Sequence, residues 1–218
     1  IGYIYDKAKR LLTVTRNSVT EGAYSYNALG LRILLTLGNN ASTVYTYDNV
    51  TRWLTGVYNY KADGITIVSS FVYNTHDKVG NRKTMTLSDG SVISYGYDST
   101  YQLINEVRTV HAAYQLSWGY DNVGNRITQT KNALLTLYNY NDANQLLTEV
   151  TCSTTTTYQY DQNGNLTVKT DPTGSTTIGY DWENRQTSFN APGTTNDATY
   201  TYDALNRRIA KTVNGVVE

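Results

Sequence analysis

Carboxylate and carboxamide side chains that recur at a regular spacing are the residues of this chain most able to do chemistry. Each one follows a tyrosine or, in one copy, a histidine, and the full set is Asp6, Asn27, Asp48, Asp77, Asp98, Asp121, Asn141, Asp161, Asp181 and Asp203. Carboxylates can bind metal ions or act as general acids and bases, whereas an oxygen of either side chain can accept hydrogen bonds in a turn. Because two positions are Asn, which keeps the acceptor oxygen without the charge, we favour turn capping.

The stretch DQNGN at residues 161–165 is the best candidate for a metal site, because it opens like a calcium-binding loop. Such a loop needs glycine at its sixth position and a carboxylate at its twelfth. The chain has Leu166 and Pro172 at these two positions, so the match fails. We therefore predict no bound metal and no cofactor.

Side chains for other kinds of chemistry are scarce. The two histidines, His76 and His111, have no partner at the spacing of a metal site or an activated nucleophile. Cys152 is the single cysteine, which excludes an internal disulfide. Common catalytic motifs and phosphate-binding glycine loops are also missing from the sequence. We predict no catalytic residue and a non-enzymatic protein.

The residue before each capping side chain marks one copy of a repeat, and we call it the anchor. The anchors are Tyr5, Tyr26, Tyr47, His76, Tyr97, Tyr120, Tyr140, Tyr160, Tyr180 and Tyr202. Successive anchors lie 20–23 residues apart, except for a gap of 29 residues after Tyr47. Four positions after the anchor, seven copies carry a glycine or an asparagine, namely Gly30, Gly80, Gly124, Gly164, Asn144, Asn184 and Asn206. Because these residue types tolerate positive φ, they predict a tight turn.

The elements that must position these turns are short strands. In ISYGYD, Ile93, Tyr95 and Tyr97 alternate with small or polar residues and so share one face of a strand. A second strand follows the turn, and turn sequences such as SDGS at 88–91 and DPTG at 171–174 close the unit. The 29-residue gap fits one lengthened hairpin with its turn near Asp63-Gly64. The sequence therefore predicts an all-β fold, a continuous antiparallel β-hairpin strip that forms a single domain over residues 1–218.

Tyrosine is unusually frequent, at 21 of 218 residues. Rows of exposed rings could bind sugars by stacking, which would make the sheet an adhesive surface. Alternatively, rings that recur on one face could stack on one another along the sheet, each cross-strand pair adding about 0.2–1 kcal/mol. We favour this structural interpretation of the tyrosines.

Arginine and leucine exchange at the position six residues after the anchor. Four copies carry Arg32, Arg82, Arg126 and Arg208, and four others carry Leu11, Leu103, Leu146 and Leu166. Because the stem of an arginine is apolar, this exchange predicts arginine side chains that pack along the column of tyrosines.

Charge and hydropathy limit the possible partners. The 18 basic residues are balanced by 18 acidic ones, so we expect no nucleic-acid partner. No apolar run approaches the roughly 18 residues of a membrane span. The sequences IGYIYD and VNGVVE predict unprotected strands at the two ends, and exposed strand edges recruit another strand. We expect pairing with further repeats of the same chain, or with identical copies end to end in a self-assembling filament.

Placed side by side, the stretches YDNVGNR, HDKVGNR, YDQNGNL and YDALNRR resemble the YD-repeats of the RHS family, and the resemblance covers essentially the whole chain. It implies a long β-sheet strip that spirals around a large hollow into a shell or tube. Bacterial RHS proteins and insecticidal toxin complexes use such a shell to enclose a toxic C-terminal domain, and teneurins, the animal cell-adhesion members, carry a related barrel.

The resemblance implies a structural protein at the cell surface or outside the cell, with an enclosed toxin or cargo domain as a partner. The sequence departs from the family in having only ten repeats and in lacking the block around an autoproteolytic aspartate, so no protease activity is assigned to Asp171. The alternative is a cell-surface adhesion or glycan-binding module that uses the tyrosine-rich faces.

Overall fold

The computed structural model describes residues 1–193 and 197–217, and the regular structure of these residues consists of β-strands alone. All strand pairs are antiparallel, which confirms the predicted fold class. The chain divides into two compact units, Ile1–Gln115 and Leu116–Glu218, which we call unit 1 and unit 2. The same repeat runs through both units.

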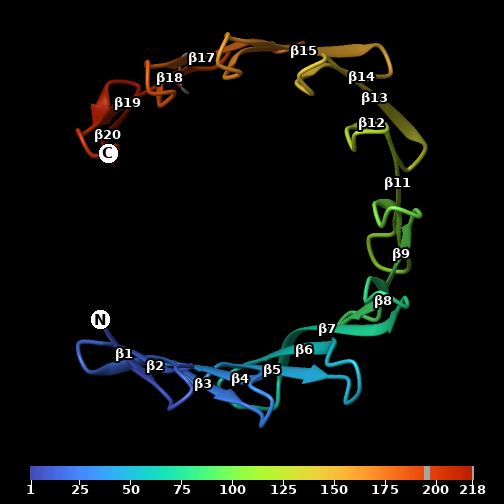
Figure 1. Cartoon of the computed structure of the whole chain (residues 1–218), viewed down its shortest axis with the longest axis vertical. Coiled ribbons are helices and arrows are strands. Elements are labelled where there is room, and N and C mark those ends of the chain that lie inside the picture. Colours follow the sequence, from blue (N-terminus) through green and yellow to red (C-terminus); the bar gives the residue numbers. More distant parts are fainter. Residues whose placement is uncertain (194–196, 218) are drawn as a thin grey trace. The chain divides into compact units, whose positions relative to one another are not determined.

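Unit 1 contains five copies of the repeat, and in it each strand pairs with the next one along the chain (Figure 1). Its strands are β1 (Gly2–Tyr5), β2 (Leu11–Arg16), β3 (Val19–Tyr26), β4 (Arg32–Leu37), β5 (Ser42–Tyr47), β6 (Leu54–Tyr60), β7 (Ile67–His76), β8 (Arg82–Leu87), β9 (Val92–Tyr97) and β10 (Leu103–Arg108). β11 (Tyr114–Tyr120) begins at the end of this unit and ends in unit 2.

Unit 2 repeats the arrangement with β12 (Arg126–Lys131), β13 (Leu134–Tyr140), β14 (Leu146–Thr151), β15 (Thr154–Tyr160), β16 (Leu166–Asp171), β17 (Gly174–Tyr180), β18 (Gln186–Asn190), β19 (Ala198–Tyr202), β20 (Arg208–Val213) and β21 (Val216–Val217). Each first strand of a repeat ends at its anchor. In the pair β13–β14, for example, Tyr138 lies opposite Glu149, and the register then shifts by one residue so that Tyr140 lies opposite Leu146.

This register shift belongs to the turn that follows the anchor. In the copy anchored at Tyr120, the N–H of Gly124 donates to the carbonyl of Asp121 (3.2 Å), and the N–H of Asp121 donates to the carbonyl of Asn125 (2.9 Å). A turn of this kind needs one left-handed residue, which forms the bulge. All ten copies contain such a residue with positive φ, and the set is Lys9, Gly30, Arg52, Gly80, Tyr101, Gly124, Asn144, Gly164, Asn184 and Asn206.

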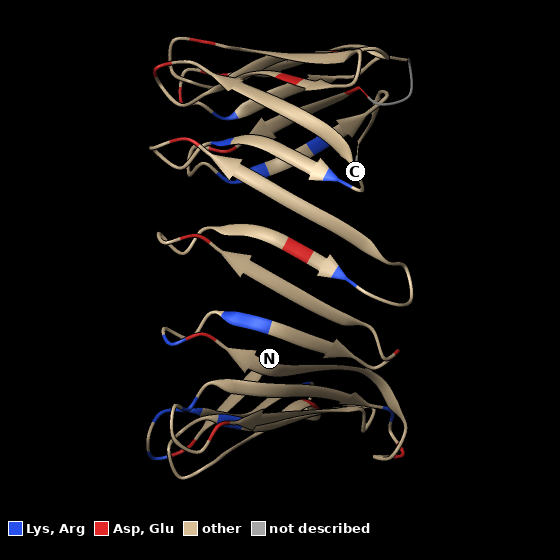
Figure 2. Cartoon of the chain, turned by 90° about the vertical axis from the view of Figure 1, so that its right-hand side faces the viewer, with Lys and Arg blue, Asp and Glu red and all other residues tan. Residues whose placement is uncertain are grey.

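The two faces of the sheet in unit 2 differ in chemistry. One face carries the anchors and, at paired strand positions, charged residues such as Glu149 opposite Tyr138 and Lys169 opposite Tyr158. The other face pairs uncharged residues, mostly threonine, as in Thr148 opposite Thr157. Figure 2 shows few charges along the strands and more of them at the turns.

Few side chains are deeply buried in either unit. The buried hydrophobic residues among those described are Met85 and Ile93, which lie opposite each other on β8 and β9, and Ala198 on β19. A sheet that lacks a second packed layer has little hydrophobic core. Contacts between successive repeats must therefore contribute much of the stability.

Candidate functional site

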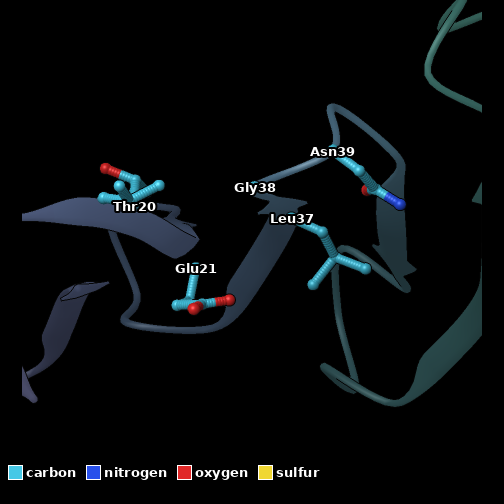
Figure 3. Close-up of a pocket in the computed structure, with 6 residues that line it drawn as sticks. Thr20, Glu21, Leu37, Gly38 and Asn39 are labelled. Carbon is cyan, nitrogen blue, oxygen red and sulfur yellow. The ribbon is translucent and has the colours of Figure 1, made fainter. Parts of the chain in front are cut away.

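A hollow in unit 1 does not have the composition of an active site. It has a volume of about 470 Å³ and lies where β3 and β4 meet the turn after Leu37 (Figure 3). Its lining residues are Val19, Thr20, Glu21, Leu37, Gly38 and Asn39. The carboxylate of Glu21 is the only titratable group among them, and Arg16 lies 3.4 Å from it. A hollow with one paired carboxylate has no second group for acid–base catalysis.

A serine, a histidine and an aspartate come together near the turn after β8 without forming a catalytic triad. Ser91 is fully buried, and its hydroxyl donates to the backbone carbonyl of His111 (3.4 Å) rather than to the ring. Asp89 binds the guanidinium of Arg108 at 2.7 Å. The serine hydroxyl donates to a backbone carbonyl and its oxygen accepts a bond from Arg108 Nη2 (3.2 Å), so these contacts hold the turn together.

Other conventional sites are missing from the described part of the chain. Residues 1–193 and 197–217 contain no group of three His, Cys, Asp or Glu side chains that could hold a metal ion. None of the described elements is a helix long and apolar enough to cross a membrane. Cys152 is an exposed free thiol in the turn between β14 and β15.

The recurring polar residues all form hydrogen bonds in the turn that follows the anchor, which we call the first turn of the repeat. Asp121 Oδ1 accepts hydrogen bonds from the backbone N–H groups of Val123 (3.0 Å) and Asn125 (2.8 Å). The same pair of bonds is made by Asp6, Asn27, Asp77, Asp98, Asn141, Asp161, Asp181 and Asp203. Asp48 caps a turn that is one residue longer and binds the N–H groups of Val50 and Thr51. Both Asn27 and Asn141 make the same two bonds without a charge.

In seven of the ten copies, the second polar atom of the cap binds the side chain five positions after the anchor, which we call the position-five residue. Asp121 Oδ2 accepts a bond from Asn125 Nδ2 (2.9 Å), and Asp181 Oδ2 accepts one from Arg185 Nε (2.7 Å). Where the cap is Asn141, its Nδ2 instead donates to Gln145 Oε1 (2.7 Å). The position-five residue thus matches the hydrogen-bonding type of its cap. The sequence contained a signal for this pairing, because the cap and the position-five residue change together between copies.

Hydrogen bonds keep the pKa values of the capping aspartates low. At Asp161, the side-chain amide and then the backbone N–H of Asn165 are the largest causes, and both lower the pKa. At Asp121, burial is the largest single influence and raises the pKa, but the hydrogen bonds from Asn125, Val123 and Gly124 together outweigh it. The pKa is lowered at all eight aspartate caps.

We expect the chain to unfold in acid as these caps become protonated. Because their folded pKa values lie below the ordinary value of 3.8, the unfolded chain takes up protons first as the pH falls. The stability that they contribute is therefore fully present above about pH 4 and is lost as the pH falls through their lowered folded pKa values. Thermal melts followed by circular dichroism across this range check the expectation. A melting temperature that stays level down to pH 2 would contradict it.

Six of the anchor tyrosines join their repeat to the one before it. The hydroxyl of Tyr140 donates to the backbone carbonyl of Arg126 (3.0 Å), and the hydroxyl of Tyr160 donates to that of Leu146 (3.0 Å). The acceptor is always the residue six positions after the preceding anchor. Tyr26, Tyr47, Tyr97 and Tyr202 make the same bond. This bond explains why the anchor is tyrosine rather than phenylalanine.

The side chain at position five reaches the next repeat. Asn125 Nδ2 donates to Asn144 Oδ1 (2.8 Å), Asn165 Nδ2 donates to Asn184 Oδ1 (2.8 Å), and Arg185 Nη1 donates to Asn206 Oδ1 (2.6 Å). In each case the acceptor is the left-handed residue of the following first turn. We call the position-five residue and this left-handed residue a seam pair.

The rings of the tyrosines contact arginines rather than one another. The guanidinium carbons of Arg32, Arg82, Arg126 and Arg208 lie 4.2–5.5 Å from the centres of tyrosine rings. Among the described residues, the recorded contact between two aromatic rings is that of Trp53 with His76 (5.3 Å). The predicted stacking of tyrosine on tyrosine was therefore wrong. A second strand separates the first strands of adjacent repeats, which places equivalent rings about 10 Å apart.

Two tyrosines on the anchor face also donate to glutamates. The hydroxyl of Tyr158 donates to Glu149 (3.1 Å), and that of Tyr114 donates to Glu106. Burial and then this hydrogen bond raise the pKa of each tyrosine to about 12. Both phenols therefore stay protonated near neutral pH and hold these glutamates on the sheet.

The anchor bond can be tested with phenylalanine. We expect Tyr140→Phe to lower the free energy of unfolding by about 1 kcal/mol, because it leaves the carbonyl of Arg126 without this donor. Tyr5→Phe is the matched control, since Tyr5 is 56% exposed and its hydroxyl makes no such bond to a described residue, and it should change little. Urea unfolding of both variants makes the comparison. Equal effects of the two substitutions would contradict an inter-repeat role for the hydroxyl.

These contacts define a class of protein, the antiparallel β-hairpin repeat proteins, in which recurring side chains tie each hairpin to the next. Residues 140–176 match the family described as RHS Repeat, which confirms the resemblance seen in the sequence. No curated protein sequence gives a match to the chain.

Solved structures show the same fold. The chain is 15% identical to a TcdB2-TccC3-Cdc42 structure, with a TM-score of 0.62 over 97% of this chain and 15% of that one. It is 16% identical to a Tc holotoxin pore of Photorhabdus luminescens, with a TM-score of 0.62 over 97% of this chain and 14% of that one. The chain thus spans only a small part of the length of these structures. At such low identity, the likeness establishes the fold alone.

Proposed function

We propose that the chain is a non-enzymatic structural YD-repeat protein that forms part of an extracellular β-shell, tube or filament. The observation that carries the proposal is that nearly every recurring polar side chain forms hydrogen bonds within its own turn or with a neighbouring repeat. Asp121 binds its own turn, Asn125 binds both this cap and the next turn, and Tyr140 binds the preceding repeat. Contacts between neighbouring repeats hold the repeats together in an extended strip.

The proposed role of each set of residues follows from these contacts. The anchors from Tyr5 to Tyr202, with His76 in one slot, hold adjacent repeats in register. The ten capping residues from Asp6 to Asp203 fix the first turns, and Gly30, Gly80, Gly124 and Gly164 provide the left-handed residue in four of them. Units 1 and 2 would act as one repeat domain, because both carry the same repeat and the same caps.

The cargo is proposed by analogy with the structural neighbours. These neighbours include structures that combine TcdB2 with TccC3 and a Tc holotoxin pore. A strip of the same fold in this chain would form one part of a shell that encloses or carries cargo such as a toxin domain. Such a shell would act outside the cell or at its surface.

The adhesive alternative has less support. In the described residues, the tyrosines with exposed rings are Tyr3, Tyr5 and Tyr101, all in unit 1. Several of the remaining rings lie against arginines, as Tyr138 does against Arg126 at 4.5 Å. Stacking on a sugar needs an open ring face. A glycan array probed with the chain and with a Tyr3→Ala/Tyr101→Ala variant would reveal this activity.

Protease protection tests the shell. The complete polypeptide that contains this stretch is treated with a nonspecific protease, and the surviving fragments are identified by mass spectrometry. We expect a second domain of the same polypeptide to survive as long as the repeats are intact, and to be degraded in an Asp121→Leu/Asp161→Leu variant with weakened turns. Equal degradation in both proteins would count against enclosure.

A further inference from the structure

Three seam pairs place a large side chain over a glycine. Asn125 and Asn165 each meet an asparagine, whereas the larger side chains of Arg10, Trp53 and Gln145 lie over Gly30, Gly80 and Gly164. Trp53 stands six positions after its anchor, because its turn is one residue longer, and we count it as the equivalent of a position-five residue. A Cβ atom at these glycines would lie 3.3 Å from Arg10, 3.1 Å from Trp53 and 3.2 Å from Gln145. Any larger residue at the glycine would have to displace the side chain above it. The residue type at the left-handed position is therefore limited by the neighbouring side chain as well as by its own positive φ.

The seam pairs are also matched in charge. Arg185 binds a neutral acceptor, Asn206, and Arg10 lies over a glycine. Arg52 is a cationic left-handed residue, and the position-five residue of the preceding repeat is the uncharged Leu31. No seam pair in the described part of either unit places two cations together. Like charges at this distance would destabilise the contact.

In the repeat anchored at Tyr202, the last one of unit 2, the described residues contain only the position-five member of a seam pair, and this residue is exposed. Arg207 binds its cap, Asp203, through Nε at 2.7 Å, as Arg185 binds Asp181 at 2.7 Å. The side chain of Arg207 is nevertheless 72% exposed, whereas that of Arg185 is 22% exposed. Arg185 contacts Asn206, Glu183 and the ring of Tyr202, whereas no described residue of a following turn contacts Arg207. Arg207 thus presents the surface that Arg185 offers to Asn206.

The strand beside Arg207 is open as well. β20 pairs with β21 only through Thr212 and Val213. The rest of β20 lines a shallow groove of about 230 Å³, made by Arg208, Ile209, Ala210 and Lys211, and Ile209 is 63% exposed. In every earlier repeat of unit 2, the first strand of the following repeat occupies this edge. The occupant that fits the groove is therefore another repeat.

We propose that the seam pair decides which repeats can be neighbours, and that Arg207 accepts a following repeat with glycine or asparagine at its left-handed turn position. A second copy of this chain does not meet this requirement. Its first turn would present Lys9 beneath Arg207, and two cations would face each other. When this stretch is studied by itself, identical copies would therefore not pair through this edge. The inference rests on the proposed structural role of the repeats.

An internal seam provides the first test, because it can be changed within the whole chain. Asn206→Lys places a cation beneath Arg185, and we expect the melting temperature to fall by about 2–4 °C. Arg185→Leu in that background recreates the combination of Leu31 with Arg52 and should recover part of the loss. Asn206→Gly is the matched control and should change the melting temperature least. If Arg185→Leu recovers nothing, the loss comes from backbone strain alone and the proposal is wrong.

The ends provide the second test. Light scattering measures the mass of the chain and of a Lys9→Asn variant, whose first turn would offer Arg207 a neutral acceptor. We expect a mass that is independent of concentration for the unchanged chain and one that rises with concentration for Lys9→Asn. Equal masses for the two proteins, whether low or high, would overturn the proposal. Both tests use the chain without cargo, so their outcome is independent of the protease experiment on the shell.

Discussion

Gly38→Ala lowers the free energy of unfolding by about 1–3 kcal/mol, the cost of forcing an extra methyl group into a filled position. A Cβ atom at residue 38 would lie 2.4 Å from the backbone carbonyl oxygen of Thr20, which cannot rotate away as a side chain can. Gly38 also donates its N–H to the carbonyl of Glu21 (3.0 Å), so the two segments cannot separate without losing this bond. Thermal or urea unfolding measures the effect.

Gly22→Ala is the matched control for this substitution. Gly22 lies opposite Leu37 on the neighbouring strand, one residue from Gly38 in the paired strand, yet the nearest atom to a Cβ at residue 22 is 3.6 Å away. We expect Gly22→Ala to change the stability little. If both variants lose the same stability, the close approach at Gly38 is not the cause.

The second large effect concerns the cap and the position-five residue together. We expect Asp161→Asn to lower the melting temperature, because its Nδ2 would face Asn165 Nδ2, which now donates to Asp161 Oδ2 (3.0 Å). Asp161→Leu should lower it further, since the backbone N–H groups of Asn163 and Asn165 would also lose their acceptor. Melting temperatures of the purified chains give the order directly.

A compensating change makes this prediction sharper. Asn165→Gln in the Asp161→Asn background recreates the neutral pair of Asn141 and Gln145, in which Asn141 Nδ2 donates to Gln145 Oε1 at 2.7 Å. The double variant should be more stable than Asp161→Asn alone. It should also show one fewer carboxyl group with a lowered pKa. A double variant that is less stable than either single variant would show that the two positions are not matched.

The architecture could be predicted from the sequence because it depends on local patterns. Alternation in ISYGYD predicts a strand, and the positive φ of Gly124 or Asn144 follows from residue type. The left-handed conformations of Lys9, Arg52 and Tyr101 were missed, because these residue types do not favour positive φ. The cap and the hairpin hold those residues in that conformation.

The contacts between repeats could not be predicted in the same way. The hydroxyl of Tyr140 binds a carbonyl 14 residues earlier, and backbone carbonyls carry no signal in the sequence. The matching of Asn141 with Gln145 left a trace, since both residues change together relative to the other copies. The predicted stacking of tyrosine rings failed because the intervening second strand was not taken into account.

Cryo-electron microscopy of the complete polypeptide that contains this stretch tests the central claim most directly. The account predicts that the repeats form part of a closed wall, with a repeat carrying glycine or asparagine in its turn seated against Arg207 and with density for cargo inside the wall. A map in which these repeats form an open sheet, with both faces in solvent and nothing paired to β20 beyond β21, would contradict it.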